Sequence, residues 1–446
     1  MTDTQDRELT NDAPVGSTIE TGPLGTATIP ASRYTSRAWA DLEAERLWPH
    51  SWQIAAARGQ VAEPGDWCEY RCGPISVLVV RGDDGELRAF QNVCLHRGNE
   101  LCSGEGRQRT EIRCGYHRWA WNLRGELREI PSRKGFGPLR NEDLPLVPVQ
   151  VDTWGELVFV NLDPEAEPLA TYLEGVPDDV AWARPDEYRM QAVLRVALDC
   201  NWKVGIEAFS ETYHVQGIHR EMLASTDDVN SPQRLWNRHG KLSQPYGVPS
   251  PRLRGGATDA EIWRSFIETQ GARMGVTDPE APAPPVPDGS TMRAVIEQAV
   301  RDEAAAKGLD LSSFDAEQVL DLHQYNLFPN ATVIYLSDAV SAMTATPGPT
   351  PDECVLTFFV AFRVPSSDAP TPRPAVMDIE PGAVSLGLIF DQDVENLPKV
   401  QRGLHQPGFT HLRLSAEECR IINLHRHLEQ ALGLQPGAEA SSQGQM

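Results

Sequence analysis

Short apolar runs and turn-forming residues alternate between about residues 52 and 162. This pattern predicts the strands of a small antiparallel sandwich or barrel. The runs are WQIAAA, ISVLVVR, LRAFQNV, EIRCGY, WAWNLRG and LVFVNL. Ahead of them, Trp39, Leu42 and Leu47 recur with a helical period. We expect Ser36, which precedes this run, to be the N-cap of that helix.

The rest of the chain contains both strand-like and helix-like patterns of apolar residues. Alternating or continuous apolar residues predict strands in VLRVALDCNW, ATVIYLSDAV and CVLTFFVAFRV. A period near 3.6 predicts helices in KVGIEAFSETYHVQGIH, TMRAVIEQAVRDEAAAK, DVENLPKVQRGL and EECRIINLHRHLEQAL. The pattern therefore indicates an α+β protein with a small all-β part and a larger part in which helices flank an antiparallel sheet.

These patterns suggest where one unit ends and the next begins. We expect an N-terminal helix over residues 31–50 to pack on the larger domain, the all-β domain to span residues 51–165, and the larger domain to span residues 166–433. Residues 1–30 and 434–446 are polar and poor in large apolar side chains, so we expect disordered tails there.

Charge and composition narrow the possible functions. The chain has 446 residues with 40 basic and 63 acidic side chains, a formal charge of −23, which disfavours binding to nucleic acid or to anionic membranes. No apolar run approaches the ~20 residues of a membrane span, and the first residues lack the features of a signal peptide. Eight cysteines in a chain of this length do not suggest a disulfide scaffold. We expect a soluble cytoplasmic enzyme.

Two loops of the predicted all-β domain each carry a thiol and an imidazole. Cys94 and His96 lie in C-L-H-R-G-N, and Cys114 and His117 lie in C-G-Y-H-R-W. Four unrelated residues are one interpretation, and a structural zinc site is a second, although zinc fingers usually pair Cys with Cys and His with His. A Rieske [2Fe–2S] cluster is the third, because two cysteines then hold one iron and two histidines the other.

A second group of chemical side chains occurs in the helix predicted near residue 210. Glu207, Glu211 and His214 would share one face of a regular helix, whereas His219 would lie roughly 140° around it from His214. We expect Gly217 to let the helix unwind or tighten so that both imidazoles converge. Two histidines and one carboxylate are typical of non-heme Fe(II) sites that activate oxygen.

The carboxylate of that site has to come from elsewhere in the chain. Asp393 is our candidate and Asp391 the fallback. A plain helix N-cap is the competing interpretation of Asp393.

Both sets of residues resemble one family. C-L-H-R-G-N…C-G-Y-H-R-W-A-W-N-L-R-G-E-L and D-V-E-N…Q-R-G are similar to segments of the large (alpha) subunits of aromatic-ring-hydroxylating oxygenases, which carry a Rieske domain. The resemblance implies that Cys94 and Cys114 ligate one iron of the cluster and His96 and His117 the other. It also implies that His214, His219 and Asp393 hold the mononuclear Fe(II).

The resemblance gives two further residues a role. Glu211 stands where many members of the family have an aspartate that bridges an iron histidine to a cluster histidine of the neighbouring subunit. Glu207 stands where relatives often carry a polar residue near the iron.

The same resemblance implies an activity and partners. It implies the oxygenase component of a system that takes electrons from an NAD(P)H-dependent reductase or a ferredoxin and mono- or dihydroxylates a hydrophobic, aromatic or cyclic small molecule. The expected assembly is a homotrimer, with or without a small β subunit. The alternatives are an oxidative O- or N-demethylase of the same family, a non-catalytic Rieske electron-transfer protein and a zinc-bearing structural protein.

Overall fold

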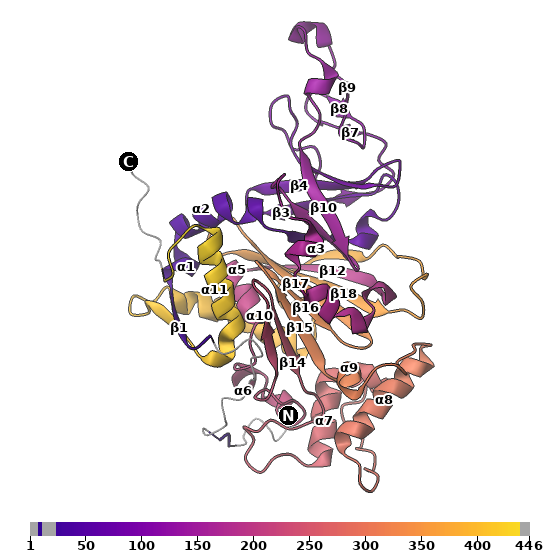
Figure 1. Ribbon diagram of the computed structural model, residues 1–446, viewed down its shortest axis with the longest axis vertical. Helices are drawn as coiled ribbons and strands as arrows, with labels where there is room; N and C mark the ends of the chain where they lie inside the picture. Colours follow the sequence, from indigo (N-terminus) through magenta and orange to yellow (C-terminus); the bar gives the residue numbers. More distant parts are fainter. Residues whose placement is uncertain (1–7, 11–23, 438–446) are drawn as a thin grey trace.

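The computed structural model describes residues 8–10 and 24–437, which form two lobes stacked along the longest axis (Figure 1). The upper lobe is built on a sheet in which neighbouring strands are antiparallel, in the order β2-β11-β10-β5-β4-β3-β6. Its strands are β2 (Gln53–Ala57), β3 (Trp67–Cys72), β4 (Ile75–Arg81), β5 (Leu87–Gln91), β6 (Glu105–Gly106), β10 (Pro148–Trp154) and β11 (Leu157–Asn161).

A smaller sheet forms the tip of the upper lobe. It consists of β7 (Ile112–Arg113), β8 (Ala120–Trp121) and β9 (Leu127–Glu129) in that order. A separate apolar core, which includes Phe90 and Trp121, packs beneath this sheet and encloses the Cys94 and Cys114 side chains. The two loops with the Cys and His residues therefore extend from their own small hydrophobic core.

The lower lobe contains a larger sheet in the order β13-β14-β15-β16-β17-β18-β12-β19. Its strands pair antiparallel except for β19, which runs parallel to β12 at one edge. The strands are β12 (Tyr188–Leu198), β13 (Gln233–Leu235), β14 (Gly240–Gln244), β15 (Leu322–Leu327), β16 (Ala331–Tyr335), β17 (Ala339–Pro347), β18 (Cys354–Arg363) and β19 (Ala375–Ile379). The α+β fold class is thereby confirmed.

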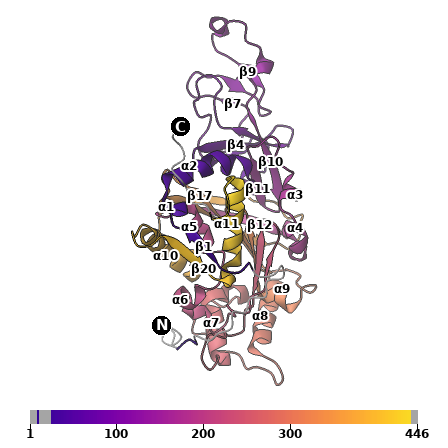
Figure 2. The same cartoon turned by 60° about the vertical axis from the view of Figure 1, so that its left-hand side comes forward.

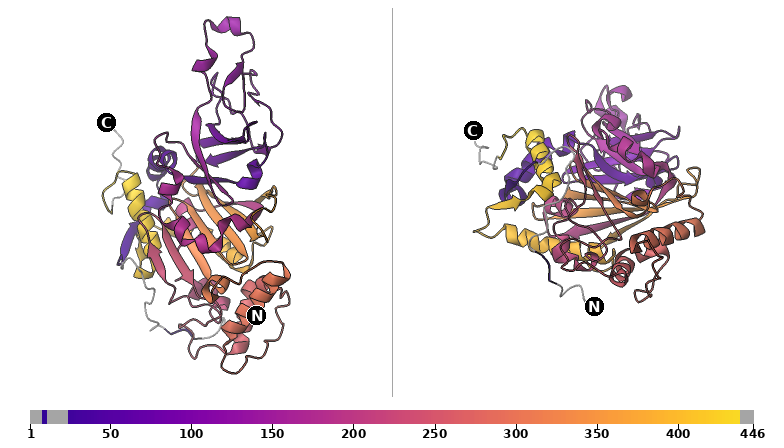
Figure 3. Two further views of the ribbon diagram at one scale, coloured as in Figure 1. Left: turned by 45° about the vertical axis from the view of Figure 1, so that its right-hand side comes forward. Right: turned by 60° about the horizontal axis from the view of Figure 1, so that its bottom comes forward.

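Helices cover the lower lobe on two sides. The helices α7 (Asp259–Gln270), α8 (Met292–Ala306) and α9 (Ala316–Leu320) lie at the end of the sheet farthest from β7–β9 (Figure 3). The longer helices α10 (Leu388–Leu404) and α11 (Cys419–Ala431) lie along the side of the lobe (Figure 2). Shorter helices are α3 (Leu169–Tyr172) and α4 (Val176–Asp179). None of the helices in the described part of the chain is both long and apolar enough to cross a bilayer.

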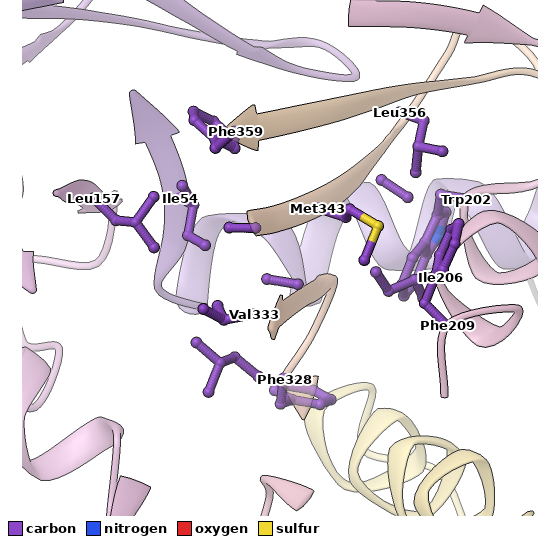
Figure 4. Close-up of a cluster of buried hydrophobic side chains, with 14 of the residues drawn as sticks. Ile54, Leu157, Trp202, Ile206, Phe209, Phe328, Val333, Met343, Leu356 and Phe359 are labelled. Carbon is purple, nitrogen blue, oxygen red and sulfur yellow. The ribbon is translucent and has the colours of Figure 1, made fainter. Parts of the chain in front are cut away.

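One hydrophobic core runs through both lobes. Ile54 and Leu157 from β2 and β11 lie in the same cluster as Val333 and Phe359 from the larger sheet (Figure 4). Separating the lobes would expose these side chains to water at a cost of about 25 cal/mol per Å². The core therefore holds the lobes in one fixed arrangement.

The N-terminal segment packs on the lower lobe. Two short helices, α1 (Ser32–Thr35) and α2 (Arg37–Arg46), replace the single helix predicted over residues 31–50, because the backbone at Ser36 is extended. The Ser36 side chain accepts a hydrogen bond from the backbone N–H of Trp39. The predicted N-cap is thus confirmed.

The tail predictions need correction. Within residues 1–30, strand β1 (Ala27–Pro30) pairs antiparallel with β20 (His411–Leu414). The hydrogen bonds to this distant strand satisfy the backbone N–H and C=O groups of β1, and such long-range pairing cannot be read from the composition of the segment. At the other end, Leu434 packs against the core and the Gly437 N–H donates to Glu429. The remaining parts of both predicted tails, residues 1–7, 11–23 and 438–446, lie outside the described residues.

The single helix predicted over residues 203–219 is also wrong. Helix α5 (Trp202–Glu207) ends at Glu207, and α6 (Val215–Ile218) begins only at Val215. Between them the Ser210 hydroxyl donates to the Ile206 carbonyl oxygen, and the Glu211 carboxylate accepts from the His214 backbone N–H. These side chains compete with the helical hydrogen bonds and start a new turn in a different direction.

A buried ion pair fixes the N-terminal helices to the lower lobe. Lys203 of α5 and Glu43 of α2 are 0% and 1% exposed, and their Nζ and Oε1 atoms are 2.7 Å apart. The indole N–H groups of Trp39 and Trp202 also donate to Glu43. Burial lowers the pKa of Lys203, and the Glu43 carboxylate opposes that shift.

We predict that Glu43→Gln destabilises the protein by about 3 kcal/mol or more, because it leaves the Lys203 charge buried without a counter-ion. The apparent Tm in a thermal scan should fall by several degrees. Glu45→Gln is the control, since Glu45 lies on the same helix with its side chain 71% exposed. Equal Tm values for the two variants would contradict this account.

Candidate metal centres

The lower lobe brings together the three side chains predicted from distant segments. One ligand atom from each of His214, His219 and Asp393 lies within 4.8 Å of the other two. The Asp393 Oδ1 atom is 3.0 Å from Nε2 of His219 and 3.8 Å from Nε2 of His214. The Asp393 and His219 side chains are 4% and 2% exposed, whereas that of His214 is 20% exposed.

The termini of a one-turn helix place the two imidazoles. His214 is the N-cap of α6 and His219 is its C-cap, with a non-helical backbone at φ −112° and ψ 47°. The ring centroids are therefore 5.1 Å apart, closer than the two rings would be on a regular helix. Gly217 stays inside α6 at negative φ, so the helix does not unwind at this glycine, and its N–H donates to the His214 carbonyl oxygen in a tight turn. The departure occurs at His219 itself.

Asp393 comes from the middle of a long helix. Helix α10 begins at Leu388 with Gly387 as its N-cap, so the interpretation of Asp393 as a helix cap is wrong. Asp391 faces a different environment, because its carboxylate accepts from the Ser385 hydroxyl and the Leu386 backbone N–H. The structure therefore places Asp393, and not the fallback residue, beside the imidazoles.

The spacing of these atoms fits one metal ion. Two ligand atoms that each lie about 2.1 Å from a first-row metal are about 3.0 Å apart at a right angle and about 4.2 Å apart across the ion. The measured separations from Asp393 Oδ1, 3.0 and 3.8 Å, fall within this range. Two imidazoles and one carboxylate that leave positions open are also the donor set typical of non-heme Fe(II).

Glu211 holds the ring of His214. Its Oε1 atom lies 2.6 Å from Nδ1 of His214, and its Oε2 atom accepts from the His214 backbone N–H at 3.0 Å. Burial opposes the charge on both groups, but their mutual attraction is stronger, so the pKa of Glu211 is lowered and the pKa of His214 is raised to about 9. A proton on Nδ1 leaves Nε2 of His214 facing Asp393.

Glu207 does not belong to this group. Its carboxylate accepts from the Tyr34 hydroxyl at 2.9 Å and lies 2.9 Å from Nε2 of His425. The prediction of one face shared by Glu207, Glu211 and His214 was wrong because α5 ends between the first two residues. Glu207 therefore links α5 to α1 and α11 instead of supporting the metal site.

The two loops of the upper lobe share one hydrogen-bond pattern. The N–H of Gly98 donates to the carbonyl oxygen of Cys94, and the N–H of Arg118 donates to that of Cys114. In return the N–H of Cys94 donates to Asn99, and that of Cys114 to Trp119. Both residues at the fourth position past the cysteine have positive φ, 74° at Gly98 and 63° at Arg118. The loops are thus near copies despite their different Cys–His spacings.

The loops bring their imidazoles together. The rings of His96 and His117 are 4.5 Å apart, and His96 stacks on Trp119 at 5.1 Å. The Nδ1 atom of His96 is buried without a hydrogen-bond partner in the described part of the chain. A buried imidazole nitrogen with no partner fits a metal ligand, since a ligated nitrogen needs no hydrogen bond.

The thiols of the two loops also interact with each other. Cys94 and Cys114 are both buried, and each affects the pKa of the other. Burial raises the pKa of Cys94. At Cys114 burial also raises the pKa, but hydrogen bonds from the N–H groups of Tyr116 and His117 and from the Cys94 and Asn99 side chains together lower it below its usual value. Two thiols and two imidazoles on paired loops fit a Rieske [2Fe–2S] cluster.

Two residues beside the metal triad had no role in the sequence analysis. Gln392 contacts Nδ1 of His219 at 2.7 Å, and Glu221 accepts from the Gln392 side-chain amide. Gln392 immediately precedes Asp393, so its position in the sequence could have suggested proximity. Nothing in the sequence pattern distinguishes Glu221.

Family comparisons cover both lobes. Residues 180–434 match the description "Ring hydroxylating alpha subunit (catalytic domain)", and residues 51–154 match "Rieske [2Fe-2S] domain". Among curated relatives, the carnitine monooxygenase oxygenase subunit of Escherichia coli (strain K12) is 32% identical over 227 residues, or 50% of this chain and 60% of the relative. The biphenyl 2,3-dioxygenase subunit alpha of Rhodococcus jostii (strain RHA1) is 32% identical over 241 residues, or 46% of this chain and 49% of the relative. The matched region thus spans about half of each curated relative.

Solved structures share the fold over nearly the whole chain. A quaternary ammonium Rieske monooxygenase in complex with L-carnitine aligns with a TM-score of 0.64 at 18% identity, covering 94% of this chain and 99% of that one. Naphthalene 1,2-dioxygenase from Rhodococcus sp. bound to indole aligns with a TM-score of 0.59 at 19% identity, covering 91% and 94%. At such identities the likeness establishes the arrangement of the elements.

The positive φ of Arg118 leads to a prediction about stability. A side chain with a Cβ atom is strained in this conformation, so Arg118→Gly should raise the stability of the upper lobe by up to about 1 kcal/mol. Arg118→Ala is the matched control, because it removes the guanidinium but keeps the Cβ atom. Thermal unfolding followed by the visible circular dichroism of the cluster would measure both. A glycine variant no more stable than the alanine variant would disprove the strain.

Proposed function

The chain belongs to the ring-hydroxylating alpha-subunit family, and on that premise we propose that it is the oxygenase component of a multicomponent system that uses dioxygen and external electrons to hydroxylate a small organic molecule. The convergence of His214, His219 and Asp393 carries this proposal. The loops of Cys94 and Cys114 support it, because an oxygenase of this kind needs an electron relay as well as a metal site.

The triad residues would hold a ferrous ion. Such an ion supplies the centre at which dioxygen is reduced and made reactive towards a substrate. The chain keeps the Nε2 atoms of both imidazoles directed at Asp393 and contributes one negative charge there. Burial of Asp393 and His219 excludes water, so that these groups keep their geometry in a medium of low polarity.

Cys94, His96, Cys114 and His117 would hold the cluster, which supplies one-electron transfer when bound. In one chain β7 and β8, which the loop of Cys114 and His117 connects, lie towards the tip of the upper lobe, whereas α6 lies in the lower lobe (Figure 1). Tyr116, next to His117, is 57% exposed, and Tyr213, next to His214, is 48% exposed. We therefore propose a head-to-tail trimer in which the upper lobe of one copy covers the His214 side of the next.

In that assembly Glu211 connects the two centres. It already holds Nδ1 of His214, whose side chain is the most exposed of the triad. We propose that the same carboxylate accepts a hydrogen bond from a cluster imidazole of the neighbouring copy. A ferredoxin or a reductase that depends on NAD(P)H would supply the electrons.

Three aromatic rings that pack on one another fit two classes of substrate. Phe209, Phe358 and Phe390 form an aromatic cluster with ring centroids 5.4 to 6.5 Å apart, on segments next to those that carry Glu211 and Asp393. These rings suit the uncharged aromatic or cyclic substrates inferred from the sequence. They equally suit a trimethylammonium group, which aromatic faces attract. The relative named for carnitine and the solved structure with bound L-carnitine favour this second class. Hydroxylation of a carbon next to nitrogen would then lead to C–N cleavage.

Metal content and product formation test the proposal together. We expect two sulfides and about three irons per chain in the purified protein. With a reductase and dioxygen, mass spectrometry should detect turnover of one member of a panel of arenes, methoxyarenes, carnitine and glycine betaine. An arene product should carry ¹⁸O from ¹⁸O₂, whereas the other three substrates should release an aldehyde together with the phenol or amine left by C–O or C–N cleavage. A cluster without mononuclear iron would indicate an electron-transfer protein, and colourless protein with zinc in both sites would indicate a structural one.

The role of Glu211 has its own test. Glu211→Ala should keep both metal centres and yet lower turnover by about 100-fold, because the link between copies and the support of His214 are lost. Glu395→Ala is the control, since Glu395 is an exposed carboxylate on the helix that carries Asp393. Iron and sulfide analysis and oxygen consumption measure the outcome. Full activity of Glu211→Ala would refute the bridge.

A further inference from the structure

The two imidazoles of the triad are supported in different ways. Nδ1 of His214 contacts a carboxylate directly, at 2.6 Å from Glu211. Nδ1 of His219 contacts the side-chain oxygen of Gln392 at 2.7 Å, and the Gln392 amide nitrogen donates to Oε1 of Glu221. The Glu221 carboxylate therefore interacts with His219 indirectly, through the side-chain amide of Gln392.

The two residues that support His219 are themselves held in place. Gln392 precedes Asp393 on α10, so one helix presents an oxygen to each nitrogen of the same ring. Glu221 lies in the 3₁₀ turn Arg220–Met222, directly after His219, and is 4% exposed. The Ser265 hydroxyl of α7 donates to the Glu221 carbonyl oxygen at 2.6 Å. Neither side chain is a loose surface group that happens to reach the ring.

The charge of Glu221 determines which way the amide points. A carboxylate only accepts hydrogen bonds, so the Gln392 NH₂ group must face it, and the reverse orientation would bring two oxygens into contact. The Gln392 oxygen is then left to face His219, where it accepts from an N–H on Nδ1. Glu221 thus favours one of the two neutral forms of His219 without contacting it.

That form is the one a metal site needs. With the proton on Nδ1, Nε2 has a free electron pair and lies 3.0 Å from Oδ1 of Asp393, which is also an acceptor. Two acceptors at this distance repel each other unless a cation lies between them. The arrangement is therefore set for a metal ion before the ion arrives.

We propose that Glu221 and Gln392 are positioning residues that hold the proton of His219 on Nδ1 and so keep Nε2 free for metal. This inference rests on the proposed metal site and adds the residues that prepare it. Oε2 of Glu221 is buried and has no hydrogen-bond partner among the described residues, so Gln392 is the side chain that engages the Glu221 carboxylate. Among the described side chains, the hydrogen bond from Gln392 is thus the one identified contact of this carboxylate.

The experiment measures Co²⁺ binding by isothermal titration calorimetry to full-length protein depleted of mononuclear iron but retaining its cluster. Glu221→Gln removes the charge and keeps the shape, so the amide of Gln392 can turn over and offer its NH₂ group to Nδ1. We expect this variant to bind Co²⁺ about 10-fold more weakly than the wild type. Gln392→Leu removes both hydrogen bonds and should weaken binding by at least as much.

A polarity swap separates this role from simple packing. In the double variant Glu221→Gln/Gln392→Glu, the carboxylate at position 392 accepts from Nδ1–H of His219 and from the amide at position 221. We expect Co²⁺ affinity within about threefold of the wild type, although the variant carries twice as many changes. Asp391→Asn is the control, because the Asp391 carboxylate lies on the same helix but accepts from residues 385 and 386. The Co²⁺ affinity of this variant should equal that of the wild type.

The outcomes distinguish the two proposals. Visible circular dichroism of the cluster and the thermal transition report whether each variant is folded, and Gln392→Leu decides the question if Glu221→Gln does not fold. Wild-type affinity in Glu221→Gln, or a double variant that binds no better than Glu221→Gln, would overturn the role of Glu221 and Gln392 while leaving the metal site intact. Wild-type protein that binds no Co²⁺ would overturn both proposals.

Discussion

The lower lobe depends on one electrostatic constraint: two imidazole nitrogens and a carboxylate oxygen must face one another without a proton between them. Nε2 of His219 and Oδ1 of Asp393 are 3.0 Å apart in a site where both side chains are almost completely buried. Without a proton on Nε2 such a contact is unfavourable until a cation lies between the two atoms, and neighbouring groups hold each side chain from behind. Glu211 does this for His214 and Gln392 for His219.

The rest of the fold serves to keep these supports in place. Asp393 and Gln392 are neighbours on α10, whereas the two histidines close the ends of α6, so one helix–helix contact sets the whole geometry. Helix α5, which precedes α6, is fixed through the Glu43–Lys203 ion pair and the contacts of Glu207 with Tyr34 and His425. Polar and charged side chains thus bind α5 to α1, α2 and α11.

The upper lobe positions its Cys and His residues with two loops of similar structure. Two loops with the same hydrogen-bond pattern place a Cys and a His from each side around one space, although their sequences differ in spacing. The repetition is costly at Arg118, where the second loop keeps a conformation that glycine adopts more easily. Because the hydrophobic core runs through both lobes, the two centres of one chain cannot approach each other by hinge motion at their boundary.

By itself the sequence determined the α+β class, strands such as β4, β11, β12 and β18, and the Ser36 cap, because these follow from local periodicity. The paired Cys–His motifs and the family resemblance then indicated the candidate ligands, Asp393 among them. The sequence failed at Glu207, since a side chain competing for backbone hydrogen bonds ended α5 in a way that no periodicity reveals. It also missed the pairing of β1 with β20, whose partners are almost 400 residues apart in the chain. Only the tertiary structure decided that Asp393 meets the two imidazoles and that Glu221 acts through Gln392, because long-range packing alone brings groups about 170 residues apart within hydrogen-bond distance.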